Sequence, residues 1–197
     1  MRNLRTTLPI GLLLTGLFCG GCAGEEGSEA VRGAGLASWA ELRRPLRIEP
    51  LPAAARCPVT KARRLSPRFA PAQGTGPVFP VGAAGDGLRF IYPVRRSQGW
   101  YPSEWGGSKV AWFAHTNFAG RVLIRGGRRD GPEGVRFGDR SQPQTELRLT
   151  FTAEDRGEDG WLFEGTYTRV RAPGCYAWQL DGRDFTRVIT FRAIRLP

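Results

Sequence analysis

The chain contains 197 residues and carries a formal net charge of +11, from 29 basic and 18 acidic side chains. Its only lysines are Lys61 and Lys109, so 27 of the basic residues are arginines. A basic balance of this size suits an anionic partner, although the arginines are scattered and form no run of four. The single histidine, His115, excludes metal sites that need several histidine ligands.

The first 21 residues have the parts of a secretory signal peptide. Arg2 and Arg5 supply positive charge, and an apolar run of eleven residues follows over 8–18. This run is shorter than the roughly 20 residues of a membrane-spanning helix. We therefore expect residues 1–21 to direct export and to be removed, which lowers the net charge to +9.

The end of this segment resembles a bacterial lipobox. It reads Leu-Phe-Cys-Gly-Gly-Cys over 17–22, which implies a lipid on the thiol of Cys22 and cleavage just before it. Cys19 replaces the leucine usual at its position, so cleavage after Ala23 is the alternative. Because two or more acyl chains anchor a protein stably, the membrane is a predicted partner. We expect an exported lipoprotein of the cell envelope, at the outer membrane or cell surface; a secreted or soluble periplasmic protein is the alternative.

The next residues predict a tether. Residues 23–36 are rich in Gly, Ala, Glu and Ser and show no apolar periodicity, which is typical of a flexible linker. A short helix is predicted over 37–44, where Pro45 would end it. Pro50 and Pro52 then favour an extended backbone.

From Pro77 onward, short apolar runs are separated by Gly, Pro and Asp-Gly pairs. In one of them Leu147, Leu149 and Phe151 point to one side of a strand and the residues between them to the other. This half of the sequence contains no helical pattern and no internal repeat. We predict strands near 78–81, 87–94, 109–115, 121–125, 134–138, 145–153, 161–171, 175–180 and 185–194.

Several short strands at this spacing predict an all-β fold, a single immunoglobulin-like antiparallel β-sandwich that ends in a hairpin. Asp181-Gly182 lies between the last two strands and favours a type I′ turn, and Asp130-Gly131 sits in a similar loop. Residues 173–176, Pro-Gly-Cys-Tyr, look like the start of the penultimate strand of immunoglobulin-like folds. We assign 57–197 to this domain, long enough for one core, and 22–56 to the tether and an extended segment.

The cysteines divide into two groups. If Cys19 leaves with the signal peptide and Cys22 carries a lipid, Cys57 and Cys175 remain as a pair. Outside the cytoplasm such a pair most simply forms a disulfide. The bond would close a loop of more than 100 residues, for which chain entropy gives at most about 4–5 kcal/mol of stability. A reactive thiol at one of them is the alternative.

The loop 99–109 places three large aromatic side chains among glycines, serines and a proline. Aromatic rings stack on the apolar faces of sugars, and nearby charged groups then reach the hydroxyls, so this loop predicts a site for an anionic or neutral glycan. The alternative is that Trp105 packs in the core together with Trp112. The predicted ligand-binding residues are Trp100, Tyr101, Trp105, Arg95 and Arg96, with Glu104 as a further polar group.

No constellation typical of an enzyme is found in the sequence. His115 lies near the end of a predicted strand, and the chain has neither a Gly-x-Ser-x-Gly elbow nor a glycine-rich phosphate loop. We therefore expect no catalytic residue, no metal and no cofactor. The alternative is a hydrolase that pairs His115 with Glu104 or with an acidic turn formed by Glu154, Asp155, Glu158 and Asp159.

Four short elements resemble those of a set of uncharacterised exported bacterial proteins. They are Arg44-Pro45-Leu46, Cys57-Pro58-Val59, the stretch 105–112 and Gly174-Cys175-Tyr176. That set shares Arg-Pro-Leu, Cys-Pro-Val, Trp-x-Gly-x-Lys-Val-x-Trp and Gly-Cys-Tyr elements. The resemblance covers roughly residues 39–195 and implies one domain with a structural cysteine pair, but no activity. We expect a non-enzymatic, lipid-anchored binding or interaction module whose partner is an envelope glycan or a protein, not a nucleic acid.

Overall fold

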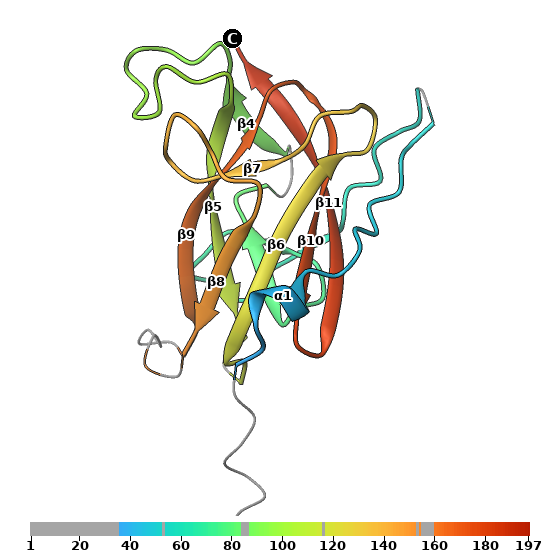
Figure 1. The fold of residues 1–197 in the computed structure, drawn as a ribbon, viewed down its shortest axis with the longest axis vertical. Helices are drawn as coiled ribbons and strands as arrows, with labels where there is room; N and C mark the ends of the chain where they lie inside the picture. The colour runs from blue at the N-terminus through green and yellow to red at the C-terminus, as the bar shows by residue number, and fades with distance from the viewer. Residues whose placement is uncertain (1–35, 53, 84–86, 116, 153, 155–159) are drawn as a thin grey trace, which may run out of the picture. The chain divides into compact units, whose positions relative to one another are not determined.

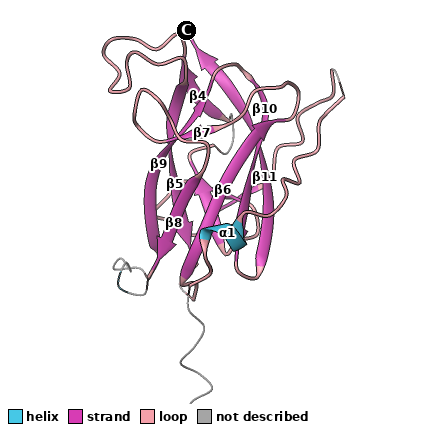
Figure 2. Cartoon of the chain, viewed as in Figure 1, coloured by secondary structure: helices cyan, strands magenta, loops and turns pink. Residues whose placement is uncertain are grey.

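Two β-sheets packed face to face form most of the described part of the chain in the computed structural model (Figures 1 and 2). The structure describes residues 36–52, 54–83, 87–115, 117–152, 154 and 160–197, and Leu36–Pro197 make up one compact unit. The predicted signal peptide and the lipidation site Cys22 lie outside the described residues. No described helix is long and apolar enough to cross a bilayer.

One sheet, the β5 sheet, has the strand order β1-β2-β3-β5-β9-β7, and the other, the β10 sheet, has the order β4-β11-β10-β6-β8. The β4–β11 pair is parallel and the other described pairs are antiparallel. The elements are α1 (Trp39–Leu42), β1 (Ala62–Arg63), β2 (Ala72–Gln73), β3 (Val78–Val81), β4 (Leu88–Ile91), β5 (Gly106–Ala114), β6 (Gly120–Arg128), β7 (Arg136–Phe137), β8 (Leu147–Phe151), β9 (Leu162–Val170), β10 (Gly174–Gly182) and β11 (Phe185–Leu196).

Aromatic side chains fill the core between the sheets. Trp112 of β5 and Trp178 of β10 meet edge to face with ring centroids 5.3 Å apart, and Phe191 of β11 stacks on Trp178 at 3.9 Å. All three side chains are buried. Because large aromatic side chains dominate the energetics of a core, this cluster is the main link between the two sheets.

The prediction of an all-β sandwich is confirmed, and a strand is present at each of the nine predicted positions. The helix predicted over 37–44 is shorter, with a capping box between Ser38 and Glu41 at its start. The strands β1 and β2 are additional, because two residues are too few to carry a detectable alternation.

The hairpin between β10 and β11 turns two residues later than the sequence predicts. Gly182 pairs with Phe185, so the turn is Arg183-Asp184 and the predicted turn residues belong to β10. The prediction of a type I′ turn at Asp181-Gly182 is therefore wrong. The physical reason is that Asp181 is fully buried and forms an ion pair with Arg125 of β6 at 2.8 Å, which keeps it within the sheet.

Residues 36–56, which the sequence assigns to a tether and an extended segment, pack against the β10 sheet. Arg44 Nη1 donates to the carbonyl of Phe185 at 2.7 Å. The Arg47 amide donates to Gln179 Oε1 at 2.6 Å. The described part of this segment therefore belongs to the folded unit.

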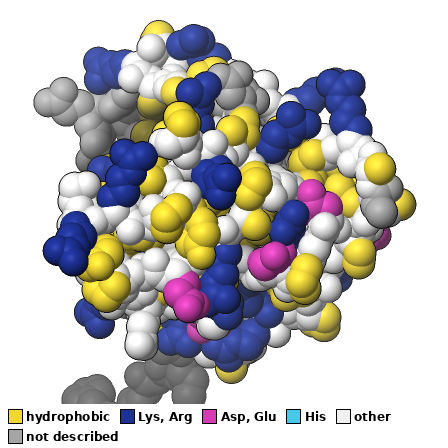
Figure 3. Space-filling view, turned by 90° about the horizontal axis from the view of Figure 1, so that it is seen from above, with side chains coloured by type: hydrophobic (Ala, Val, Ile, Leu, Met, Phe, Trp, Pro, Cys, Tyr) yellow, Lys and Arg dark blue, Asp and Glu magenta, His cyan; other side chains and the backbone are white. Residues whose placement is uncertain are grey.

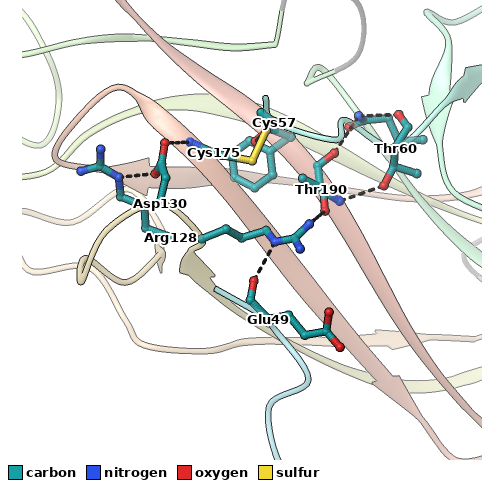
Figure 4. Close-up of a disulfide and its surroundings, with 10 residues drawn as sticks. Glu49, Cys57, Thr60, Arg128, Asp130, Cys175 and Thr190 are labelled. Atoms are coloured by element: carbon teal, nitrogen blue, oxygen red, sulfur yellow. Dashed lines mark hydrogen bonds and ion pairs between the residues drawn. A yellow bond between two sulfur atoms is a disulfide. The ribbon is translucent and has the colours of Figure 1, made fainter. Parts of the chain in front are cut away.

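The disulfide between Cys57 and Cys175 is present, as predicted, so a free thiol at either position is excluded. It joins the segment before β1 to the start of β10 (Figure 4). Beside it, the Cys175 amide donates to Asp130 Oδ2 at 3.0 Å and the Thr190 amide donates to Thr60 Oγ1 at 2.9 Å. Covalent and hydrogen bonds thus hold residues 57–60 against β10 and β11.

Candidate functional site

The predicted ligand-binding residues lie in the loop 92–105 between β4 and β5. This loop is at the end of the sandwich where the chain finishes (Figure 1), and Arg95 Nη2 donates to the Pro197 carbonyl at 2.9 Å. We call this the C-terminal end, and the opposite end, where β10 turns into β11, the hairpin end. Figure 3 shows that the C-terminal end presents more basic than acidic side chains, with hydrophobic side chains between them.

A buried arginine of β9 fixes the shape of this end. Arg169 donates to the Trp105 carbonyl from Nε at 3.1 Å and from Nη2 at 2.5 Å, and to Ser103 Oγ from Nη2 at 3.0 Å. Its Nη1 donates to the carbonyls of Gly138 and Arg140, both at 3.0 Å. All five N–H donors of the guanidinium are thereby used, and they tie the loop 92–105 to the loop that follows β7.

The surroundings of Arg169 explain why it holds this position. Burial lowers the pKa of Arg169 to about 10, against the opposing effect of the Asp139 charge, so the side chain is still a cation at neutral pH. Its neighbour across the ladder is Gly107 of β5. A Cβ at Gly107 would lie 2.5 Å from Arg169 Cδ and 2.7 Å from the Thr168 carbonyl oxygen. Glycine at 107 therefore makes room for the buried guanidinium.

Trp100 anchors the loop and is turned toward the protein. Its side chain is only 9% exposed, meets Tyr167 edge to face at 4.9 Å, and lies 4.3 Å from Arg169 Cζ. Its indole Nε1 has no hydrogen-bond partner among the described residues. With Arg169 already over its ring, Trp100 offers little surface to a ligand.

Trp105 and Tyr101 offer more surface. Trp105 is partly exposed, and its ring centroid lies 5.1 Å from Arg136 Cζ and 4.4 Å from Arg171 Cζ. It is absent from the core that contains Trp112, so the alternative of a core position for Trp105 is wrong: its neighbours are guanidinium groups on the surface. Tyr101 is 45% exposed, with Arg96 Cζ 6.0 Å from its ring centroid.

Several residues of this surface were missed by sequence reasoning. Tyr167, Arg169 and Arg171 alternate along β9 and its continuation, so they lie on one face, and this alternation is a signal that the sequence does carry. Arg136 lies opposite Arg169 in β7, a strand too short to show a pattern. Glu104, the predicted further polar group, forms an exposed ion pair with Arg171 at 2.6 Å.

The geometry separates the residues of the hydrolase alternative. Glu104 precedes β5 and His115 follows it, and nine residues of strand span about 30 Å, so the pairing of Glu104 with His115 is wrong. His115 Nδ1 accepts a hydrogen bond from the Asn117 amide at 3.3 Å, and its ring meets Trp161 edge to face. In the acidic turn, Asp155, Glu158 and Asp159 lie outside the described residues.

The chemistry available at the C-terminal end is recognition, through exposed aromatic faces and planar cations that bind carboxylate or phosphate groups. Within the described ranges, no three His, Cys, Asp or Glu side chains are grouped so as to hold a metal ion. No family model, curated protein or solved structure matches the chain. Its function is therefore inferred from geometry and chemistry.

Proposed function

We propose that this chain is a non-enzymatic binding module of the bacterial cell envelope, anchored through a lipid on Cys22, and that its C-terminal end binds an anionic glycan. The anchor is supported by the lipobox-like sequence at 17–22. Labelling with a radioactive fatty acid tests it: the wild-type chain takes up label, and the Cys22→Ala variant does not.

The surroundings of Trp105 carry the glycan proposal. The Trp105 side chain is partly exposed, and the guanidinium carbons of Arg136 and Arg171 lie 5.1 and 4.4 Å from its ring centroid. Sugars stack their apolar faces on aromatic rings, and the arginine fork matches carboxylate and phosphate geometry. Anionic polysaccharides of the cell envelope carry both sugar rings and carboxylate or phosphate groups, and an exported protein meets them in its own compartment.

The binding surface is also held in place before a ligand arrives. Arg169 fixes the Trp105 backbone and the carbonyls of residues 138 and 140, and a surface that is already ordered loses less entropy on binding. Tyr101 and Arg96 extend this surface along the loop. Binding is therefore expected to survive salt concentrations that abolish simple charge attraction.

The test measures binding of the full chain, purified in a non-ionic detergent, to alginate and to dextran. Alginate is a polymer of uronic acids and dextran is neutral. The assay is run at about 0.15 M and about 0.5 M salt, where the Debye length falls to about 4 Å. The test variant is Tyr101→Ala/Trp105→Ala. The matched control is Trp39→Ala, because Trp39 of α1 is also partly exposed and lies 5.0 and 5.5 Å from the Arg121 and Arg148 guanidinium carbons.

We expect alginate binding that persists at about 0.5 M salt, weakens at least tenfold in the double variant and is unchanged in Trp39→Ala. Binding that disappears at high salt and is the same in wild type and the double variant would mean general charge attraction and would contradict the proposal. Salt-resistant capture of an envelope protein, with no polysaccharide retained, would replace the glycan by a protein partner.

A further inference from the structure

A concave site lies at the hairpin end, away from the proposed glycan surface. Its volume is about 510 Å³, within the range of roughly 300–1,000 Å³ typical of small-molecule sites. Both sheets contribute to its walls: Arg63 and Phe79 come from β1 and β3 of the β5 sheet, and Arg187 comes from β11 of the β10 sheet. The connection between β5 and β6 closes it with His115 and Phe118.

The charged groups in this cavity are of one sign. Among the described residues that line it there is no carboxylate. Neither Arg63 nor Arg187 forms an ion pair with any described residue. Arg63 and Arg187 are exposed, and two guanidinium groups with no ion-pair partner among the described residues raise the local concentration of anions.

The Arg187 side chain is held in position by hydrogen bonds to two backbone carbonyls. Its Nε donates to the Gly76 carbonyl at 3.1 Å and its Nη1 to the Thr186 carbonyl at 3.0 Å. Its Nη2 has no partner within the part of the chain that the structure describes. The guanidinium is therefore fixed while some of its N–H donors are still available.

His115 adds a third donor of defined tautomer. Its Nδ1 accepts from the Asn117 amide at 3.3 Å, which places the hydrogen of the neutral ring on Nε2. The ring is held edge to face against Trp161 at 5.9 Å. An oxyanion in the cavity can therefore receive a hydrogen bond from His115 as well as from the arginines.

The apolar wall is equally well defined. Phe79 is 1% exposed, and Arg63 Cζ lies 5.1 Å from its ring centroid. Gly76 has a φ of +82°, and a Cβ there would lie 2.3 Å from Phe79 Cζ, so only glycine allows this ring position. Phe118 packs at 5.9 Å against both Phe151 and Phe185. Cationic side chains and apolar side chains therefore line the same cavity.

We infer that this cavity binds a small organic anion, a carboxylate or a phosphate ester, with its head group at Arg63, Arg187 and His115 and its apolar body against the partly exposed Phe118. The site is independent of the proposed glycan surface, which lies at the other end of the sandwich. Failure of one proposal therefore leaves the other standing.

The test is a calorimetric titration of the full chain in non-ionic detergent, with matched micelle blanks. Three probes separate the two halves of the site: phenyl phosphate has the charge and the ring, inorganic phosphate has the charge alone, and phenol has the ring alone. The variants are Arg63→Gln, Arg187→Gln and their combination. Arg195→Gln is the matched control, because Arg195 is an exposed arginine of the same strand β11 outside the cavity.

We expect phenyl phosphate to bind at least tenfold more tightly than either other probe. The double variant should lose at least tenfold in affinity for phenyl phosphate, and Arg195→Gln should lose none. Arg63→Gln keeps the test valid if Arg187→Gln disturbs folding, because the Arg63 side chain makes no hydrogen bond to the described backbone, and we expect at least a threefold loss of affinity from this variant alone. Equal binding of phenol, equal binding of inorganic phosphate, or unchanged affinity in Arg63→Gln would overturn the inference.

Discussion

At the scale of single residues, Arg169 is the side chain on which the C-terminal end depends most. Its guanidinium is buried and donates only to uncharged oxygens of two loops. Replacing it by methionine leaves these acceptors without donors in a buried site. We expect Arg169→Met to lower the free energy of unfolding by roughly 2–4 kcal/mol, since each buried unsatisfied group costs about 1–3 kcal/mol and the desolvation of one charge is relieved. Urea denaturation measures this loss.

Arg171→Met is the control, because Arg171 lies two residues further on the same face and its ion pair with Glu104 is exposed. Such pairs contribute little to stability, so we expect the free energy of unfolding to change by no more than about 0.5 kcal/mol. Equal losses in the two variants would refute the role given to Arg169.

The sequence does place Trp100, Tyr101 and Trp105 in one loop. It does not reveal which ring faces solvent, because that depends on contacts of Arg169 with residues 64 positions away.

At the scale of elements, the docking of the N-terminal segment onto β8 depends on Glu146. This carboxylate accepts hydrogen bonds from Arg43 at 2.8 Å and from Arg148 at 2.6 Å. The hydrogen bond from Arg43 is the main reason why the pKa of Glu146 is lowered, with burial opposing it. In the folded protein the pKa of Glu146 lies below its value in the unfolded chain, about 4.3. The stabilisation is therefore present above about pH 4.3 and is lost as the pH falls through the pKa of the folded protein.

We therefore expect Glu146→Gln to lower the free energy of unfolding by about 0.5–1 kcal/mol at pH 7, a figure kept small because both arginines are nearly half exposed. The difference from wild type should vanish near pH 2. Denaturation of both proteins at the two pH values measures it. Glu104→Gln is the control for removal of a carboxylate in an exposed ion pair, because the Glu104 side chain is 78% exposed. A difference that persists in acid would rule out the ionised form of Glu146 as its source.

The elements also mark where sequence patterns stop being informative. Alternation locates several strands, such as β8, because one face of such a strand is buried in the common core. The turn at Arg183-Asp184 escapes prediction, because Asp181-Gly182 has the better local turn propensity, whereas contacts of the buried Asp181 with the distant Arg125 and with Gln179 and Thr186 keep it in the strand. The segment 36–56 escapes it for a similar reason. Its three prolines interrupt any regular pattern, and it docks through the buried Leu42 and through hydrogen bonds from Arg44 to residues 141 and 142 positions away.

At the scale of the whole molecule, a disulfide joins two segments of the sandwich that are far apart in the sequence. Cys57 and Cys175 are separated by 118 positions, and the residues around Cys57 form no long strand of their own. Without the disulfide, this segment is held by hydrogen bonds such as those between Thr60 and Thr190. The compartment inferred from the signal sequence and the pairing of the two cysteines are consistent with each other, because structural disulfides form and persist mainly in oxidising compartments.

We expect Cys57→Ser/Cys175→Ser to lower the free energy of unfolding by up to about 4–5 kcal/mol, the chain-entropy value for a loop of this length. Against a typical domain stability of about 5–15 kcal/mol, this loss brings the chain close to unfolding at physiological temperature. Urea denaturation with and without a reductant measures this loss. The reduced wild type should have the same free energy of unfolding as the double variant, and the reductant should not change the value for the double variant. A change below about 1 kcal/mol would contradict this prediction and would mean that residual structure in the reduced, unfolded chain already supplies most of the constraint.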